Sequence, residues 1–230
     1  MGVRKGALAV DLGLIGYEEA RQLQLALVSA RQTGRLQMDI FLFLEHLPVM
    51  TLGKRGGREN LIVSEAFLDQ RKIPLILSER GGEITYHGPG QLVVYGILDL
   101  TQNRMDVPGF VFALEESMIR SLAAYGLTGE RLPVNRGVFL SGAKIGSVGI
   151  GLKNSVTFHG MALNVTLDLA PFSWINPCGL RGVKMTSIQN EISGRVHMIE
   201  VKAMVRTALE DLFALSFEDQ GRSCIEKAFC

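Results

Sequence analysis

Two segments of alternating residues flank a polar Lys-Asn-Ser tripeptide at positions 153–155. Side chains of a strand alternate between its two faces, so this pattern predicts an antiparallel hairpin with a short turn. With the turn centred on Lys153 and Asn154, one face carries Lys144, Val148 and His159 among apolar residues. The chain must therefore fold around a sheet that places a lysine against its core.

The buried position expected for Lys144 needs an explanation, because an ammonium is costly to remove from water. One explanation is structural: the side chain extends its charged end to the sheet edge, and His159 is a hydrogen-bonded core histidine. The other is chemical, with Lys144, His159 and Cys178 as candidate functional residues. The hairpin alone leaves both explanations open.

The size and composition of the chain indicate one globular domain, with 230 residues, 47% of them hydrophobic and 20% charged. We expect a single domain over residues 1–230, with a core at about 7–215 and a C-terminal tail at 216–230. A net charge of +1 without a Lys/Arg-dense run argues against nucleic-acid binding. No apolar run approaches the ~20 residues that span a bilayer, and three cysteines suggest neither disulfides nor a metal site. We therefore expect a cytoplasmic protein that does not enter a membrane.

Helical spacing of apolar residues predicts long helices over Tyr17–Arg35, Pro108–Tyr125 and Val196–Leu215, and Ser64 predicts the start of a short helix. Strands outnumber helices and do not alternate regularly with them. This order favours an α+β fold with a mixed or antiparallel sheet and flanking helices. Residues 216–230 have the character of a poorly packed tail.

Two glycine-rich stretches stand apart from these elements. Residues 80–91 read RGGEITYHGPGQ, which suggests a loop laid against a ligand, although a Gly/Pro-rich hairpin explains the composition equally well. Residues 53–58 read GKRGGR and lack the order of a phosphate-binding loop. We interpret the second stretch as a solvated basic loop, with an acidic partner surface as the alternative.

Cys178 lies between a proline and a glycine in the sequence NPCG, a context that exposes a sulfur at a cavity wall. A free thiol has a pKa of about 8.5, and a nearby ammonium favours the reactive thiolate. Lowering that pKa by ~2 units needs about 2.7 kcal/mol. Lys144 is the candidate ammonium, and the pairing would offset the burial cost of both charges. Cys224 and Cys230 have no such framing.

Four blocks of the chain resemble the lipoyl(octanoyl) transferases in order and spacing. They are RGGEITYHGPGQ at 80–91, GAKI at 142–145, FHGMALNV at 158–165 and INPCG at 175–179. The resemblance is close over roughly Leu52 to Ile188.

The resemblance implies a fold similar to the catalytic domains of biotin protein ligases and lipoate ligases. It implies transfer of an octanoyl (or lipoyl) group from acyl-carrier protein to a specific lysine, with octanoyl-acyl-carrier protein as the donor. The acceptors would be lipoyl domains of 2-oxoacid dehydrogenases and the glycine-cleavage H protein. It implies no cofactor, ATP or metal, and we expect a monomer.

By motif matching, Cys178 would form the acyl thioester and Lys144 would lower its pKa. The resemblance also implies an acyl site made of the residues Arg80, Gly81, Gly82, Glu83, Ile84, Thr85, Tyr86, His87, Ser147, Val148, Gly149, His159, Gly160, Met161 and Ala162.

Three other functions compete with this interpretation. An ATP-dependent lipoate-protein ligase on the same fold would not need Cys178. A non-catalytic module would bind lipoyl domains or acyl groups without turnover. A cysteine protease would need His159 or His87 as the base beside Cys178.

Overall fold

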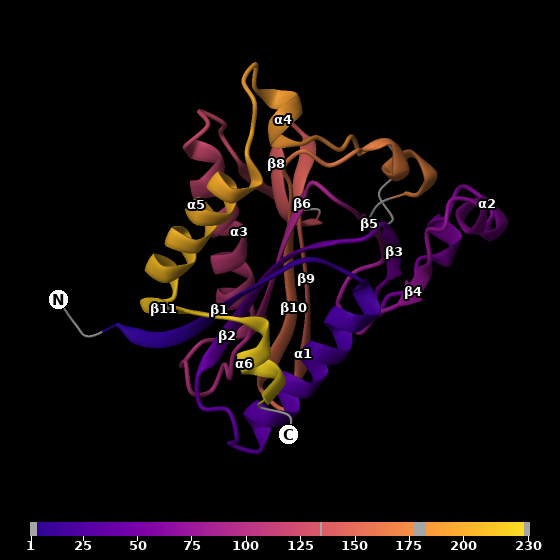
Figure 1. Cartoon of the computed structure of the whole chain (residues 1–230). Helices are drawn as coiled ribbons and strands as arrows, with labels where there is room; N and C mark the ends of the chain where they lie inside the picture. The colour runs from indigo at the N-terminus through magenta and orange to yellow at the C-terminus, as the bar shows by residue number, and fades with distance from the viewer. Residues whose placement is uncertain (1–3, 134, 177–182, 228–230) are drawn as a thin grey trace.

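A computed structural model describes residues 4–133, 135–176 and 183–227 (Figure 1). An eight-stranded mixed sheet forms its centre, and a three-stranded sheet lies beside it. The long helices α3 and α5 cover one face of the large sheet, and α1 covers the other. This arrangement confirms the α+β prediction.

The large sheet has the strand order β11-β1-β2-β6-β10-β9-β8-β7. Its strands are β1 (Lys5–Ile15), β2 (Asp39–His46), β6 (Gln91–Ile97), β7 (Glu130–Leu132), β8 (Asn135–Leu140), β9 (Ala143–Lys153), β10 (Val156–Asn164) and β11 (Leu215–Gln220). The pairs that β1 forms with β11 and β2 are parallel, and the other pairs are antiparallel. The small sheet has the order β4 (Leu75–Leu77), β3 (Val49–Leu52) and β5 (Ile84–His87).

The helices of the described residues are α1 (Tyr17–Gln32), α2 (Glu65–Gln70), α3 (Val107–Ala123), α4 (Ile188–Glu191), α5 (Met198–Leu212) and α6 (Arg222–Lys227). The three predicted long helices are confirmed. Helices α1 and α5 are a few residues shorter than predicted, and α3 begins one residue earlier and ends two residues earlier. Ser64 caps α2 as predicted, because its hydroxyl accepts a hydrogen bond from the Phe67 N–H at 3.2 Å. Asp106 caps α3 in the same way.

The predicted hairpin forms from β9 and β10, but its turn lies one residue later than expected. Asn154 and Ser155 both have positive φ, of 47° and 67°, and Lys153 pairs with Val156. Such a pair of left-handed residues matches the right-handed twist of the two strands. His159 therefore pairs with Ile150 rather than Val148. Each residue of β10 thus pairs two positions further along β9 than predicted. Because side chains alternate with a period of two, a shift of two positions leaves paired residues on the predicted face of the sheet.

His159 itself departs from the predicted face. Its φ is 57°, and its ring packs against Tyr17 of α1 and Tyr95 of β6. Met161 and Val148 instead join the core beneath α3 and α5. Period-two alternation fails at His159 because a left-handed residue interrupts the extended backbone.

The segment after Leu215 is not the poorly packed tail that its sequence suggested. Residues 215–220 form β11, which pairs in parallel with β1 along its length. Phe217 makes edge contacts with Phe41 and Phe43, and Ile225 of α6 is buried. Pairing with β1 supplies the packing that local sequence did not indicate.

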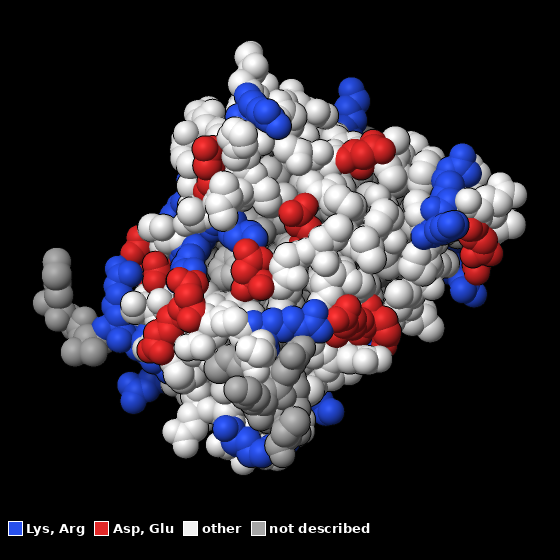
Figure 2. Space-filling model, in the orientation of Figure 1, with Lys and Arg blue, Asp and Glu red and all other residues white. Residues whose placement is uncertain are grey.

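Acidic and basic side chains are interspersed over the molecular face in Figure 2, without a large area of one sign. This distribution agrees with the net charge of +1. Within the described ranges, no helix is long and apolar enough to cross a membrane.

Candidate functional site

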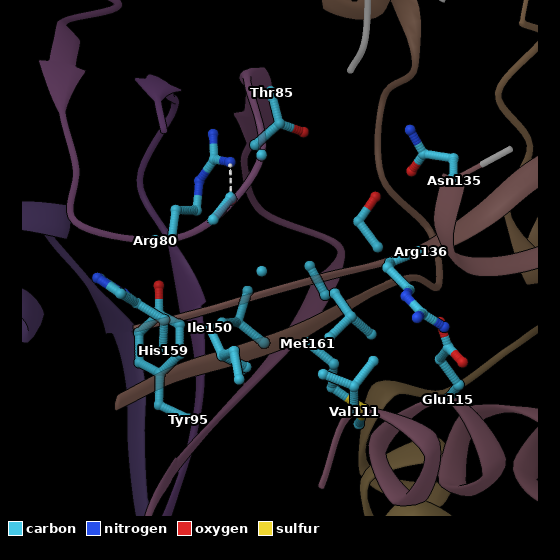
Figure 3. Close-up of a pocket in the computed structure, with 18 of the residues that line it drawn as sticks. Arg80, Thr85, Tyr95, Val111, Glu115, Asn135, Arg136, Ile150, His159 and Met161 are labelled. Carbon is cyan, nitrogen blue, oxygen red and sulfur yellow. Dashed lines mark hydrogen bonds between the residues drawn. The ribbon is translucent and has the colours of Figure 1, made fainter. Parts of the chain in front are cut away.

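A cavity of about 690 Å³ lies between the loop that precedes β5 and the strands β9 and β10 (Figure 3). Arg80 and Thr85 form one wall, and Ile150 and Met161 lie on the opposite side. A cavity of this size accommodates a small ligand. It lies where the two glycine-rich stretches of the sequence meet.

The floor of the cavity is apolar and narrow. The apolar side chains of the cavity lining include Val93, Val111, Val148, Ile150 and Met161. Gly149 and Gly160 lie among them without side chains. A Cβ at Gly149 would be 3.1 Å from the Gly81 carbonyl oxygen, so the two walls approach closely there.

Lys144 is held at one end of this cavity. Its side chain is buried, with 1% of the residue exposed, in β9. The Nζ donates hydrogen bonds to the Asn135 side-chain oxygen and, at 3.0 Å, to the Arg136 carbonyl. Both of these residues line the cavity, at the end opposite His159 and Tyr95 (Figure 3). Both of these hydrogen bonds are to neutral oxygens, and they hold the ammonium in place.

A glycine lets β8 accommodate Lys144. Gly137 has φ 129°, and a Cβ there would be 2.2 Å from the Gly146 carbonyl oxygen and 3.0 Å from Lys144 Cε. Its N–H donates to the buried Glu115 carboxylate at 2.8 Å, and Glu115 pairs with Arg131 at 3.1 Å. The lysine is therefore positioned by a bulged strand that α3 anchors.

The loop before β5 is fixed to the small sheet through Arg80. Its guanidinium donates to the Thr51 carbonyl at 2.7 Å, to the Thr51 hydroxyl at 2.8 Å and to the Glu83 carbonyl at 2.6 Å. Gly53 permits this close approach, because a Cβ there would be 2.3 Å from the Gly82 carbonyl oxygen. Arg80 thus ties the loop to β3 of the small sheet by charge-assisted hydrogen bonds.

Three histidines and two tyrosines cluster at the far end of the cavity: Tyr17, His46, His87, Tyr95 and His159. Neighbouring rings have centroids 5.2 to 6.4 Å apart. Burial lowers the pKa of His46 to about 4 and the pKa of His87 and His159 to about 3. All three imidazoles are therefore neutral at pH 7, and such weak bases are poorly suited to activate a thiol.

The structure brings most of the predicted acyl-site residues to the cavity. Those that line it are Arg80, Gly81, Gly82, Thr85, His87, Ser147, Val148, Gly149, His159, Gly160, Met161 and Ala162. Glu83, Ile84 and Tyr86 do not. Ile84 is buried in the small sheet's core, Tyr86 packs against Phe172, and Glu83 accepts a hydrogen bond from Asn60. Cys178 lies outside the described residues.

Several cavity residues were not predicted from the sequence. These residues come from four different elements, and their positions depend on how the elements pack: Tyr17, Tyr95, Glu115, Asn135 and Arg136. Glu115 had one usable signal, since it is a carboxylate on the buried face of a helix. Within the described ranges, no group of three or more His, Cys, Asp or Glu residues has metal-site geometry.

Comparison with known proteins gives a consistent picture. The family model "Lipoyl protein ligase A/B catalytic domain" matches residues 16–210. An octanoyltransferase of Desulfotalea psychrophila is 48% identical over 206 residues, which cover 89% of this chain and 92% of that protein. An octanoyltransferase of Syntrophobacter fumaroxidans is 41% identical over 220 residues, covering 96% of each.

Two solved structures share the fold. A bi-partite lipoate protein ligase from Thermoplasma acidophilum superposes with a TM-score of 0.75 at 17% identity, covering 98% of this chain and 90% of that one. A biotin protein ligase from Aquifex aeolicus, solved with biotin and ATP, gives a TM-score of 0.54 at 12% identity, covering 90% and 68%. At these identities the likeness shows the fold alone.

Proposed function

The chain belongs to the lipoyl protein ligase A/B catalytic domain family and is an acyltransferase that transfers octanoyl groups in protein lipoylation, and we propose that it works through a thioester on Cys178. The observation that carries this mechanism is the buried Lys144 ammonium, which donates a hydrogen bond to the carbonyl of Arg136 at one end of the cavity. A buried cation of this kind is favoured when an anion lies beside it. A cysteine thiolate would be that anion, and it is also the nucleophile that the reaction needs.

The chain that follows Cys178 contacts the backbone of Lys144, which supports the proposed pairing. The Lys144 N–H donates to the Lys184 carbonyl at 2.8 Å, and the Thr186 N–H donates to the Lys144 carbonyl at 2.9 Å. Cys178 precedes Lys184 by six residues, which span at most about 20 Å when extended. Pairing of Cys178 with the ammonium is compatible with this span.

The reaction that follows from this pairing has two balanced steps. The Cys178 thiolate attacks the thioester carbonyl of the octanoyl donor, and the carrier leaves as a thiolate that takes up a proton. The lysine amine of the acceptor then attacks the enzyme thioester, which forms the amide and restores the Cys178 thiolate. Lys144 would give a proton to the departing carrier thiolate and take one from the attacking lysine amine. It can change its protonation state in this way because the negative charge of the Cys178 thiolate beside it disappears while the cysteine is acylated. Exchange of one thioester for another is nearly balanced in free energy.

The cavity suits the acyl chain in this reaction. Its apolar floor, opened by Gly149 and Gly160, offers a slot for an eight-carbon chain. We propose that the twelve predicted residues lining the cavity form the acyl site. Glu83, Ile84 and Tyr86 would support its wall.

The acceptors are proteins that carry lipoyl domains. We further propose that the acceptors include lipoyl domains of 2-oxoacid dehydrogenases and the glycine-cleavage H protein, and that the donor is octanoyl-acyl-carrier protein. We propose that residues 1–230 form a single catalytic domain and that the enzyme acts as a monomer. A free catalytic thiol favours a reducing compartment, so we propose a cytoplasmic location.

Turnover without nucleotide separates the transferase from an ATP-dependent ligase. Purified enzyme is mixed with a lipoyl domain and either octanoyl-acyl-carrier protein alone or octanoic acid with ATP and Mg²⁺. We expect modification of the lipoyl-domain lysine with the first pair, as measured by intact mass. Modification with the second pair alone would identify a ligase, and modification with neither would identify a binding module.

Alkylation rates test the role of Lys144. With iodoacetamide at pH 7, we expect Cys178 to react about ten-fold faster in wild type than in Lys144→Met, because the ammonium favours the thiolate. Peptide mapping reads the three cysteines separately, so Cys224 and Cys230 serve as internal controls. Equal rates for Cys178 in both proteins would contradict the pairing.

A further inference from the structure

The side-chain amide of Asn135 has two ends, and the described residues supply a partner for one of them. Its Oδ1 accepts a hydrogen bond from Lys144 Nζ. An ammonium only donates, so this contact fixes the amide with Oδ1 toward the lysine and the Nδ2 amino group away from it. Within the residues that the structure describes, Nδ2 donates to no other group. Asn135 therefore holds a donor in a fixed direction.

This donor faces the cavity. Asn135 belongs to β8 and lines the cavity at the end where Lys144 is held. Figure 3 shows its amide directed across the cavity, toward the wall that carries Arg80 and Thr85. The residue is partly exposed, so a molecule in the cavity can reach Nδ2. An acyl group bound near Lys144 would lie beside it.

The contact with Lys144 makes Nδ2 a stronger donor. A cation at Oδ1 draws electron density toward that oxygen and leaves the Nδ2 hydrogens more positive, as hydrogen bonds in a chain polarise one another. Lys144 is buried, so water screens its field only weakly. The amide therefore offers a negatively charged oxygen a better hydrogen bond than an isolated asparagine would.

The proposed reaction creates such an oxygen in each of its two steps. As the Cys178 thiolate attacks the donor thioester, a C–S bond forms and the π electrons of the carbonyl move onto its oxygen. The oxyanion lasts until the C–S bond to the carrier breaks. The same charge develops when the acceptor amine attacks the enzyme thioester. Each step is faster when a fixed donor lies beside that oxygen.

Two backbone N–H groups around Lys144 are already used within the protein. The Lys144 N–H donates to the Lys184 carbonyl at 2.8 Å, and the Gly137 N–H donates to the Glu115 carboxylate at 2.8 Å. Neither can turn toward a substrate without breaking a contact that holds this end of the cavity. The Nδ2 of Asn135 has no such contact within the described ranges.

We propose that Asn135 is a catalytic residue whose Nδ2 donates a hydrogen bond to the oxyanion of both steps. This inference rests on the proposed function, which places the thioester carbonyl next to Lys144. Asn135 would hold the ammonium through Oδ1 and stabilise the oxyanion through Nδ2. The same side chain would thus contact both charged groups of the reaction.

Two reactions of Cys178 separate this role from the holding of Lys144. Alkylation by iodoacetamide needs the thiolate but forms no oxyanion, whereas acylation by octanoyl-acyl-carrier protein needs both. Asn135→Ala removes the whole amide, and Asn135→Ser keeps an oxygen that can accept from the lysine but lacks the amide donor. Asn190→Ala, at an exposed position of α4 outside the cavity lining, is the matched control.

We expect both Asn135 variants to form the acyl-enzyme about 100-fold more slowly than wild type, the usual effect of removing one oxyanion donor. Intact mass spectrometry in single turnover, at saturating octanoyl-acyl-carrier protein, measures this rate. The alkylation rate of Cys178 should stay close to that of wild type. The KM for the donor should change little, because the hydrogen bond strengthens only in the transition state. Asn190→Ala should match wild type in both reactions.

Equal losses of acylation and alkylation would overturn the proposal, because they would show that Asn135 only positions Lys144. Acylation at the wild-type rate in both Asn135 variants would overturn it as well, and would leave the proposed function intact. If wild type itself forms no acyl-enzyme while iodoacetamide still alkylates its Cys178, the proposed function fails, and the role of Asn135 fails with it.

Discussion

Lowering the pH from 7.5 to 5 is expected to destabilise the fold strongly, because three histidines are buried as neutral imidazoles. Burial lowers the pKa of His46 to about 4, and of His87 and His159 to about 3. In the unfolded chain a histidine titrates near 6.5. Below that pH the unfolded state binds more protons than the folded state, so the free energy of unfolding falls as the pH falls.

The size of this effect follows from the number of protons. Each histidine contributes about 1.4 kcal/mol per pH unit below 6.5 until its folded pKa is reached, so three contribute about 4 kcal/mol per unit. Between pH 6.5 and pH 5 the total is about 6 kcal/mol. Domains are typically stable by 5–15 kcal/mol, so the protein should lie close to unfolding at pH 5.

Urea denaturation followed by circular dichroism at several pH values between 5 and 7.5 measures how steeply the free energy of unfolding changes with pH, which is the slope compared below. His159→Gln should lower it by about one third, since one of three protons is removed, while His197→Gln at an exposed position should leave it unchanged. A slope that is the same in wild type and His159→Gln would refute the reasoning. NMR titration midpoints between 6 and 7 for the three histidines would refute it too.

Three further substitutions test single contacts. Gly149→Ala should lower kcat/KM for octanoyl donors several-fold, because the added methyl group narrows the acyl slot. Gly194→Ala, where a Cβ meets open space, should leave kcat/KM unchanged. Steady-state kinetics with the octanoyl donor measures both values. Asp39→Asn should lower the free energy of unfolding, measured by urea denaturation, by about 3 kcal/mol, because it leaves the buried Arg31 guanidinium without the carboxylate 3.0 Å away. A loss below about 1 kcal/mol would contradict the importance of this ion pair. Gly137→Ala should lower the melting temperature by several degrees and slow the formation of the acyl-enzyme, because a Cβ there would lie 2.2 Å from the Gly146 carbonyl oxygen. An unchanged melting temperature and an unchanged acylation rate would show that the bulge tolerates a side chain.

Local sequence predicted those parts of the fold that local patterns determine. The apolar spacing of residues 108–125 predicted α3, and the alternation around Asn154 predicted the hairpin. The turn was placed one residue early, because the sequence does not state which two residues adopt positive φ. The strand at 215–220 was missed, since its stability comes from pairing with β1 over 200 residues away.

The site was predictable where its residues share a motif. The stretch 80–87 and the hairpin residues 147–149 and 160–162 largely meet at the cavity as the family resemblance implied. Asn135 and Arg136, which hold Lys144, were not predicted, because the bulge that aligns β8 with β9 has no pattern in the sequence. Their role became visible through the hydrogen bonds of the lysine.

The central claim is that an octanoyl group passes through Cys178. The most direct measurement is intact-protein mass spectrometry after mixing the enzyme with octanoyl-acyl-carrier protein and no acceptor, beside Cys178→Ala. We predict one octanoyl group on wild type, absent from the variant, removed by hydroxylamine, and passed to a lipoyl-domain lysine when the acceptor is added. Octanoylation of the lipoyl domain by Cys178→Ala at the wild-type rate, without an adduct on the enzyme, would contradict the account.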